Sequence, residues 1–260
     1  MRRSKGRHTL KLSIRVSLGF AGVFAALSAQ RVAVGQQLDR RVLPVPEPPP
    51  VVITELSARD VKPPARFEVK APEGAPNVVV VLLDDIGFGQ SSAFGGPIKM
   101  PTLDSLAAGG LRFNNFHTTA LCSPTRMALL TGRNHHVNNA GAIMELATAF
   151  PGNTGIRPQS VAPLAEMLRL NGYSTAAFGK YHETPPWEVS VSGPFDRWPT
   201  HSGFDKFYGF IGGETNQWHP MVYDGTTRVY PDVESPGYHF TTDMTNQALA
   251  WLNTQRSLTP

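Results

Sequence analysis

Residues 121–126 read Leu-Cys-Ser-Pro-Thr-Arg and continue to residue 133 as Met-Ala-Leu-Leu-Thr-Gly-Arg. Ser123 suits a helix N-cap, Pro124 suits the first helical position, and Gly132 suits the residue after a helix end. The pattern predicts a short helix with Cys122, the only cysteine of the chain, just before its N-terminus. Arg126 lies about one turn further on, so its guanidinium can return to that end. Together these groups favour binding of a tetrahedral oxyanion, and an ordinary buried cysteine is the alternative.

A second candidate site follows an apolar run at residues 78–83. Six consecutive apolar residues predict a central parallel strand that is covered on both faces. Asp84 and Asp85 come directly after it, at the strand end where open α/β sheets place ligands. Two adjacent carboxylates repel each other unless a cation neutralises them, and oxygen ligands favour calcium or magnesium. The alternative is an Asp-rich turn that caps the next element.

The remaining chain predicts further helices and strands in alternation, which is typical of an α/β fold. Helices are expected at residues 101–108, 160–170 (capped by Ser160) and 241–254, and strands at residues 111–118 and 173–178. Lys180 and His182 follow the last strand, and their alternation would put both side chains on one side. Residues 183–236 are irregular and aromatic, which predicts a long insertion beside or over the pocket. A carbohydrate-stacking surface is the alternative for this segment.

The N-terminal region predicts export. The first 28 residues hold six positive and no acidic side chains, and residues 16–27 are largely apolar. We therefore expect a signal peptide over residues 1–35 and a periplasmic or secreted protein, with an uncleaved anchor as the alternative. The apolar run is too short to span a bilayer comfortably, so no stable membrane insertion is expected after signal removal.

Charge and proline content divide the rest of the chain. Without the six N-terminal positive residues the net charge would be −2 instead of +4, so no nucleic-acid surface is predicted. Residues 36–75 are rich in proline and predict an extended arm or linker, because proline at this density excludes helices. Residues 76–260 are expected to form the folded domain. A single cysteine excludes an internal disulfide.

The cysteine motif and its surroundings resemble a known family. Cys-x-Pro-x-Arg followed by Leu-Leu-Thr-Gly-Arg resembles the signature of the type I sulfatases, in which the cysteine is oxidised after translation to formylglycine. The spacing between Cys122 and Arg126 is too short for a tyrosine-phosphatase loop. The order of the Asp-Asp turn, the cysteine motif and Gly-Lys-Tyr-His at residues 179–182 is similar to the N-terminal catalytic part of bacterial arylsulfatases.

The resemblance implies an alkaline-phosphatase-like fold, a mostly parallel sheet flanked by helices, apparently truncated here at the C-terminus. It also implies hydrolysis of a small-molecule or carbohydrate sulfate ester through a formylglycine hydrate. The implied catalytic residues are Cys122, Arg126, Lys180 and His182, and the implied metal ligands are Asp84, Asp85 and the modified Cys122. Calcium is the implied metal, with magnesium as the alternative, and a formylglycine-generating maturation enzyme is an implied partner.

Within this pattern, Arg126 would hold the hydrate, Lys180 would bind a sulfate oxygen, and His182 would accept a proton from the hydrate. The family's second Asp–Asn metal pair has no convincing counterpart in this sequence. We therefore expect a fragment or truncated form that has little or no activity alone. A phosphate or phosphonate monoester hydrolase of the same superfamily and a non-catalytic exported binding protein derived from a sulfatase are the alternatives.

Overall fold

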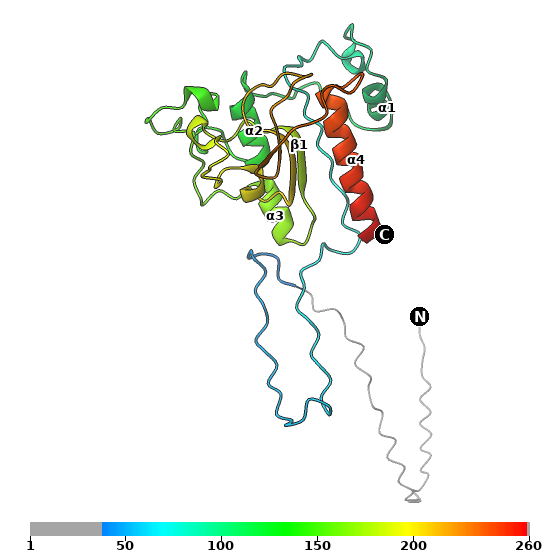
Figure 1. Cartoon of the computed structure of the whole chain (residues 1–260), viewed down its shortest axis with the longest axis vertical. Coiled ribbons are helices and arrows are strands. Elements are labelled where there is room, and N and C mark those ends of the chain that lie inside the picture. The colour runs from blue at the N-terminus through cyan, green and yellow to red at the C-terminus, as the bar shows by residue number, and fades with distance from the viewer. Residues whose placement is uncertain (1–37, 259–260) are drawn as a thin grey trace, which may run out of the picture. The chain divides into compact units, whose positions relative to one another are not determined.

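The computed structural model describes residues 38–258, so the predicted signal peptide lies outside the described residues. Four α-helices are present in this range: α1 (Pro101–Gly109), α2 (Cys122–Thr131), α3 (Leu164–Leu170) and α4 (Phe240–Leu258) (Figure 1). The strands are β1 (Ala176–Lys180), β2 (Lys206–Phe210), β3 (Val222–Asp224) and β4 (Thr227–Val229). Short 3-10 helices span Ser92–Phe94 (η1), Met144–Leu146 (η2), Pro186–Glu188 (η3) and Pro199–His201 (η4).

The four strands form one mixed sheet in the order β1-β2-β3-β4. β1 pairs with β2 in parallel, with Ala176 opposite Lys206 and Lys180 opposite Phe210, and the other two pairings are antiparallel. The strand predicted at residues 173–178 is therefore present but begins and ends slightly later. β2, β3 and β4 all lie in the segment that the sequence predicted as an irregular insertion, so that prediction was wrong. Its frequent glycines and prolines hide short strands, and the parallel partner of β2 is distant in sequence.

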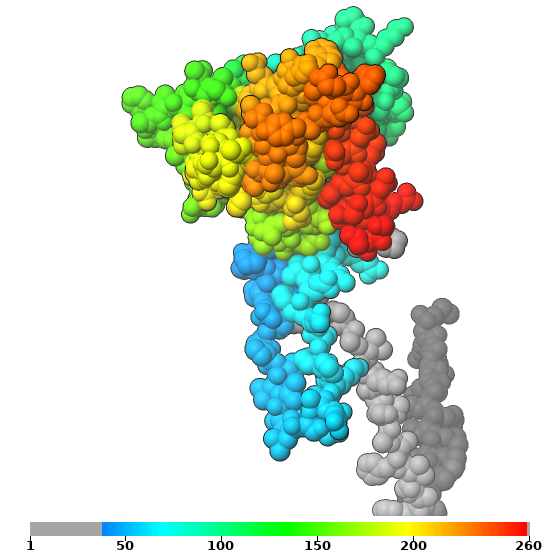
Figure 2. Space-filling view, viewed as in Figure 1, coloured from blue at the N-terminus to red at the C-terminus, as the bar shows by residue number. Residues whose placement is uncertain are grey.

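The same segment supplies the main hydrophobic core. Its fully buried centre is Trp198, which packs edge-to-face against Phe195 and Tyr223. The aromatic side chains that were weighed as a carbohydrate-stacking surface are thus largely core residues. A second buried cluster joins β2 and β3 to the first residue of α4, Phe240. Figure 2 shows the segment around β3 and β4 (orange) packed beside α4 (red).

Two of the predicted helices begin at other residues than expected. Cys122 is the first residue of α2 and Leu121 is its N-cap, so Ser123 does not cap the helix. Instead, the Ser123 hydroxyl accepts a hydrogen bond from the backbone N–H of Met144 at 3.3 Å. The helix predicted from Ser160 begins only at Leu164, because Pro163 restricts the preceding residue to extended backbone.

The predicted helix ends and the other two helices agree better with the structure. Gly132 ends α2 in the left-handed conformation with φ 65°, as its position predicted. α1 lies where a helix was expected, and α4 is longer than the predicted range. No helix among residues 38–258 combines the length and apolarity that a membrane span needs.

Two apolar segments do not form the strands that were predicted. Residues 78–83 belong to no strand, and the exposed fractions of their side chains run from 40% for Leu83 to 77% for Val79. Residues 111–118 are also outside any strand, and Leu111, Phe113 and Phe116 are exposed. Among the described residues no strand pairs with either segment. Apolar composition alone could not produce the predicted strands without hydrogen-bonded neighbours.

The proline-rich segment forms neither helix nor strand over residues 38–75 (Figure 1). It nevertheless contacts the domain, because the Arg40 guanidinium donates hydrogen bonds to the backbone and side-chain oxygens of Asn171, just after α3. The boundary between an arm and a folded domain near residue 76 stays a prediction.

Candidate functional site

Four residues that the sequence singled out meet around one carboxylate. Asp84 Oδ1 accepts a hydrogen bond from Arg126 at 3.0 Å, and Asp84 Oδ2 accepts one from Lys180 Nζ at 2.8 Å. Lys180 Nζ also lies 3.2 Å from Cys122 Sγ. The end of the apolar run, the first turn of α2 and the carboxyl end of β1 therefore meet at one place.

The two cations of this cluster are buried and hydrogen-bonded. The side chains of Arg126 and Lys180 are each only 9% exposed. Arg126 also donates a hydrogen bond to the backbone oxygen of Lys180 at 2.8 Å, which ties α2 directly to the last residue of β1. Buried cations at a helix N-terminus and a strand end can hold the oxygens of a tetrahedral anion.

The Asp84 carboxylate is stabilised in its charged form. Partial burial alone would raise its pKa, but the hydrogen bonds and charges of Lys180 and Arg126 outweigh burial and lower the pKa. The cluster is thus an ionic network at neutral pH. On binding an anion, Lys180 and Arg126 would exchange their contacts with Asp84 for contacts with the oxygens of the anion.

Asp84, Asp85 and Cys122 fit part of a metal site. One possible ligand atom from each lies within 4.8 Å of the other two. The carboxylate oxygens suit a hard divalent cation, whereas a thiol suits a softer metal, so residue 122 matches this metal better when it carries oxygen. Three residues are fewer ligands than calcium takes. Asp85 has a positive φ of 55°, a conformation that Asp tolerates better than most residues.

His182 adopts a different position from the one that the strand-like alternation predicted. Its φ is 56°, so the chain turns at this residue and does not continue as a strand. Its ring is 4% exposed, and Nε2 lies 2.8 Å from Glu145 Oε2. Burial lowers the pKa of His182, as do the charges of Lys180 and Arg126, whereas Glu145 raises it. His182 thus follows Lys180 by two residues in the chain, and its ring contacts Glu145.

Sequence reasoning missed Glu145. It lies on η2, beyond the end of α2, and belongs to no recognisable motif. The only available signal would have been an acidic residue in an otherwise apolar stretch, Ala-Ile-Met-Glu-Leu at residues 142–146. Partial burial opposes ionisation, but the hydrogen bond with His182 and the charge of Lys180 lower the pKa of Glu145.

A second acidic residue beside the cluster was also missed. Glu183 follows His182 and is 4% exposed, and burial raises its pKa to about 8 although the charges of Arg157 and Arg126 oppose this. Its Oε1 and Arg126 Nε are both buried without a hydrogen-bond partner among the described residues. With this pKa the Glu183 carboxyl is largely protonated at neutral pH, so it is a buried neutral group beside Arg126 and not a counter-charge for the cluster.

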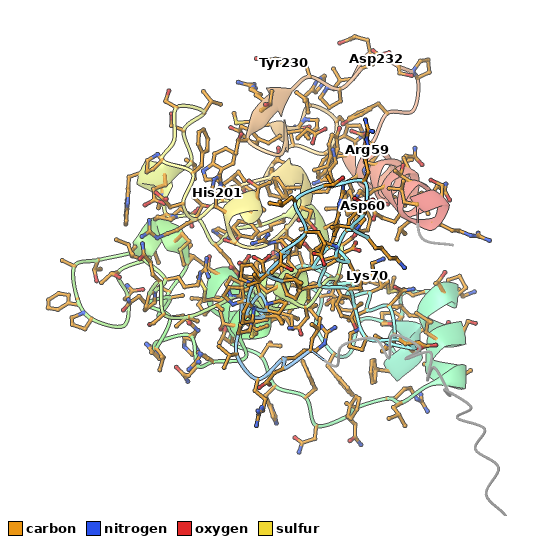
Figure 3. The ribbon with its side chains drawn as sticks, turned by 90° about the horizontal axis from the view of Figure 1, so that it is seen from below. Arg59, Asp60, Lys70, His201, Tyr230 and Asp232 are labelled. Carbon is orange, nitrogen blue, oxygen red and sulfur yellow. The ribbon has the colours of Figure 1, made fainter. Side chains whose placement is uncertain are left out.

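Two cavities of the described domain are lined by residues outside this cluster. One, of about 670 Å³, is lined by the segment after β4 and the start of α4. Figure 3 shows two of its residues, Tyr230 and Asp232, at the margin of the molecule. Another, of about 320 Å³, follows β2 and includes Ile211 and Gly212. Neither is lined by the six residues that the sequence predicted as a site.

The chain is similar in sequence to known proteins. A sequence profile of the family described as "Sulfatase" matches residues 76–259. An uncharacterized sulfatase of Schizosaccharomyces pombe is 35% identical over 176 residues, which are 64% of this chain and 29% of that protein. Arylsulfatase A of Homo sapiens is 39% identical over 136 residues, 52% of this chain and 25% of that protein. An arylsulfatase of Klebsiella aerogenes is 30% identical over 163 residues, 62% of this chain and 33% of that protein.

These matches cover only part of the relatives. The chain spans from 25% to 33% of the length of the three proteins named. The family match covers most of this chain, and it confirms the expected alkaline-phosphatase-like α/β fold class. Among the described residues the sheet is mixed and not mostly parallel as expected, because two of its three pairings are antiparallel.

Proposed function

Since this chain belongs to the sulfatase family, we propose that it carries part of the active site of a sulfate monoester hydrolase. The observation that supports this best is the convergence of Lys180, Arg126 and Asp84 on Cys122. The substrate class is a small-molecule or carbohydrate sulfate ester, since the site offers buried cations for one tetrahedral anion.

In this proposal residue 122 acts as formylglycine, made from the cysteine by a maturation enzyme. The position of Cys122 at the first turn of α2, partly exposed beside Lys180, suits a group that must meet both that enzyme and the substrate. A hydrated aldehyde carries two hydroxyl groups on one carbon. One attacks sulfur and displaces the alcohol, and loss of a proton from the other then expels sulfate and restores the aldehyde.

The surrounding side chains have separate tasks. Lys180 and Arg126 offset the negative charge of the sulfuryl oxygens during the transfer. His182 accepts the proton of the second hydroxyl. A neutral imidazole is needed for this step, and the burial that lowers the pKa of His182 favours that form at neutral pH.

Asp84, Asp85 and residue 122 would hold a divalent cation, which we propose to be calcium, with magnesium as the alternative. Such an ion would polarise the attacking hydroxyl and neutralise charge on the sulfate. We further propose export to the periplasm or beyond, on the basis of the N-terminal sequence. The partial metal shell leads us to expect weak hydrolysis from this chain alone.

Peptide mass spectrometry on protein from its own host tests the proposal most directly. The peptide that contains residue 122 is expected to have the lower mass of formylglycine. Hydrolysis of 4-nitrophenyl sulfate and 4-nitrophenyl phosphate should be compared for the wild type, Cys122→Ala and His182→Gln. His117→Gln is the control, because His117 is exposed and hydrogen-bonds Asn115 outside the cluster.

We expect turnover of the sulfate to exceed that of the phosphate and to disappear with Cys122→Ala. An unmodified thiol would favour the non-catalytic binding protein, and a preference for phosphate would favour the phosphoester hydrolase. Sulfate turnover that survives in Cys122→Ala would show that residue 122 is not the nucleophile.

A further inference from the structure

Glu145, which contacts His182, has no role in the function proposed above. Nε2 of the buried ring faces the carboxylate at 2.8 Å, whereas Nδ1 is buried without a hydrogen-bond partner among the described residues. A neutral imidazole carries one proton, on either Nδ1 or Nε2. The nitrogen that lacks this proton is the one that can accept a second proton.

Only one tautomer satisfies these surroundings. A proton on Nδ1 would be a buried donor without an acceptor, and the Nε2 lone pair would then face a negative carboxylate. A proton on Nε2 is donated to Glu145, and the Nδ1 lone pair stays free. An unpaired acceptor is less costly than an unpaired N–H.

We propose that Glu145 is a positioning residue for His182, holding the proton on Nε2 so that Nδ1 is the atom that accepts a proton. During proton transfer the Nδ1 lone pair forms the new N–H bond, and the O–H bond of the donor hydroxyl breaks. The ring then carries a positive charge, which the Glu145 carboxylate balances. This fate of the proton rests on the proposed function, whereas the tautomer does not.

The fold is arranged to keep this pair together. Met144, which precedes Glu145, is buried against Met127 of α2, so η2 is attached to the helix that carries Cys122 and Arg126. On the other side, the His182 N–H donates to the Ile211 oxygen at 3.0 Å and continues the pairing of β1 with β2. The positive φ of His182, a conformation that costs on the order of 1 kcal/mol, aims the ring at Glu145.

Gly213 lies against the His182 ring and supplies an independent way to disturb the pair of His182 and Glu145. A Cβ at this position would lie 2.9 Å from His182 Cε1 and 3.0 Å from Nε2. Gly213→Ala must therefore displace the imidazole without removing any charge. Gly212→Ala is the matched control, because a Cβ there would meet no atom within 4 Å.

Imidazole ¹⁵N NMR on the unmodified chain in chelator tests the proposal without any activity. His182→Gln identifies the signals of the ring. In the wild type at neutral pH we expect a protonated Nε2 and an unprotonated Nδ1. Glu145→Gln is expected to lower the pKa of His182, since Lys180 and Arg126 then act on the ring without the opposing carboxylate, and Glu145→Asp should restore part of the loss.

Gly213→Ala should shift the ring signals away from the wild-type positions, and Gly212→Ala should leave them unchanged. A proton on Nδ1 in the wild type would overturn the proposal. An unchanged pKa of His182 in Glu145→Gln would overturn it too. Because the chain is measured with an unmodified Cys122, these results stand apart from any failure to hydrolyse sulfate esters.

Discussion

Two apolar parts of this molecule have different environments. Phe207 is 1% exposed on β2, a strand that pairs with β1 on one side and β3 on the other, whereas Val79 in the run at residues 78–83 is 77% exposed. Both segments have the composition of a buried strand. The difference shows that burial here follows backbone pairing, which β2 has and the run at residues 78–83 lacks among the described residues. The candidate site joins the two parts, because Asp84 comes from the run and Lys180 from the sheet.

The largest difference between the two parts should appear on truncating an apolar side chain in each. Trp198→Ala removes a fully buried indole that also donates a hydrogen bond to the Glu188 backbone oxygen. We expect a loss of about 3–5 kcal/mol in the free energy of unfolding. Val80→Ala in the exposed run should cost no more than about 0.5 kcal/mol. Urea unfolding, followed by circular dichroism, measures both.

A loss of several kcal/mol in Val80→Ala would show that residues 78–83 are packed in solution. The comparison of the two parts would then have to be abandoned.

A smaller effect is expected at the junction of the two parts. Arg126→Met removes the hydrogen bonds to Asp84 and to the Lys180 backbone oxygen and leaves that partly buried oxygen without this donor. Because Asp84 keeps Lys180 and is partly exposed, we expect a loss of about 2 kcal/mol. Arg169→Met is the control, because it breaks an exposed pair with Glu166 that contributes less than about 1 kcal/mol. Equal losses for both variants would show that the Asp84 network stabilises nothing.

The sequence predicted the four meeting residues because each belongs to a local pattern. Cys122 and Arg126 share one short motif, and Asp84 and Lys180 each follow an apolar segment with the composition of a strand. The ends of such segments gather at one edge of an α/β sheet, so their proximity could be expected. Their catalytic and metal-binding roles stay predictions.

The features that were missed depend on contacts between distant residues. Glu145 reaches His182 only because Met144 packs on α2, and no periodicity in the sequence indicates that contact. β2 was missed because Gly209 interrupts its aromatic pattern. The strand needs glycine at this position, because a Cβ there would lie 1.9 Å from the Gly179 backbone oxygen. The run at residues 78–83 was wrongly assigned because strand formation needs a partner that the pattern cannot reveal.

A third comparison concerns the pH dependence of stability that the buried Glu183 causes. Burial raises the pKa of Glu183 from 4.5 to about 8, so between these values the folded chain binds more protons than the unfolded chain. This contribution to stability is fully present below pH 4.5 and is lost as pH rises to about 8. Glu183→Gln removes the dependence, and its stability relative to the wild type should rise by up to about 1.4 kcal/mol per pH unit. Thermal unfolding from pH 5 to pH 8 measures the difference.

The exposed Glu214→Gln serves as the control for this measurement and should follow the wild type at every pH. Parallel curves for Glu183→Gln and the wild type would mean that Glu183 is hydrated in solution or already paired with Arg157.

The smallest effect on stability is expected where the apolar run is most exposed. Val79→Lys and Val81→Lys, made together, place two charges on side chains that are 77% and 73% exposed. Because neither side chain is buried, the free energy of unfolding should change by no more than about 0.5 kcal/mol. A contiguous exposed apolar segment with unpaired backbone groups favours association between chains, so the lysines should reduce it. Light scattering against concentration measures this, with Lys62→Arg as a charge-conserving surface control. Unchanged association would show that residues 78–83 do not mediate contact between chains, whereas a large loss of stability would show that the run is a packed strand after all.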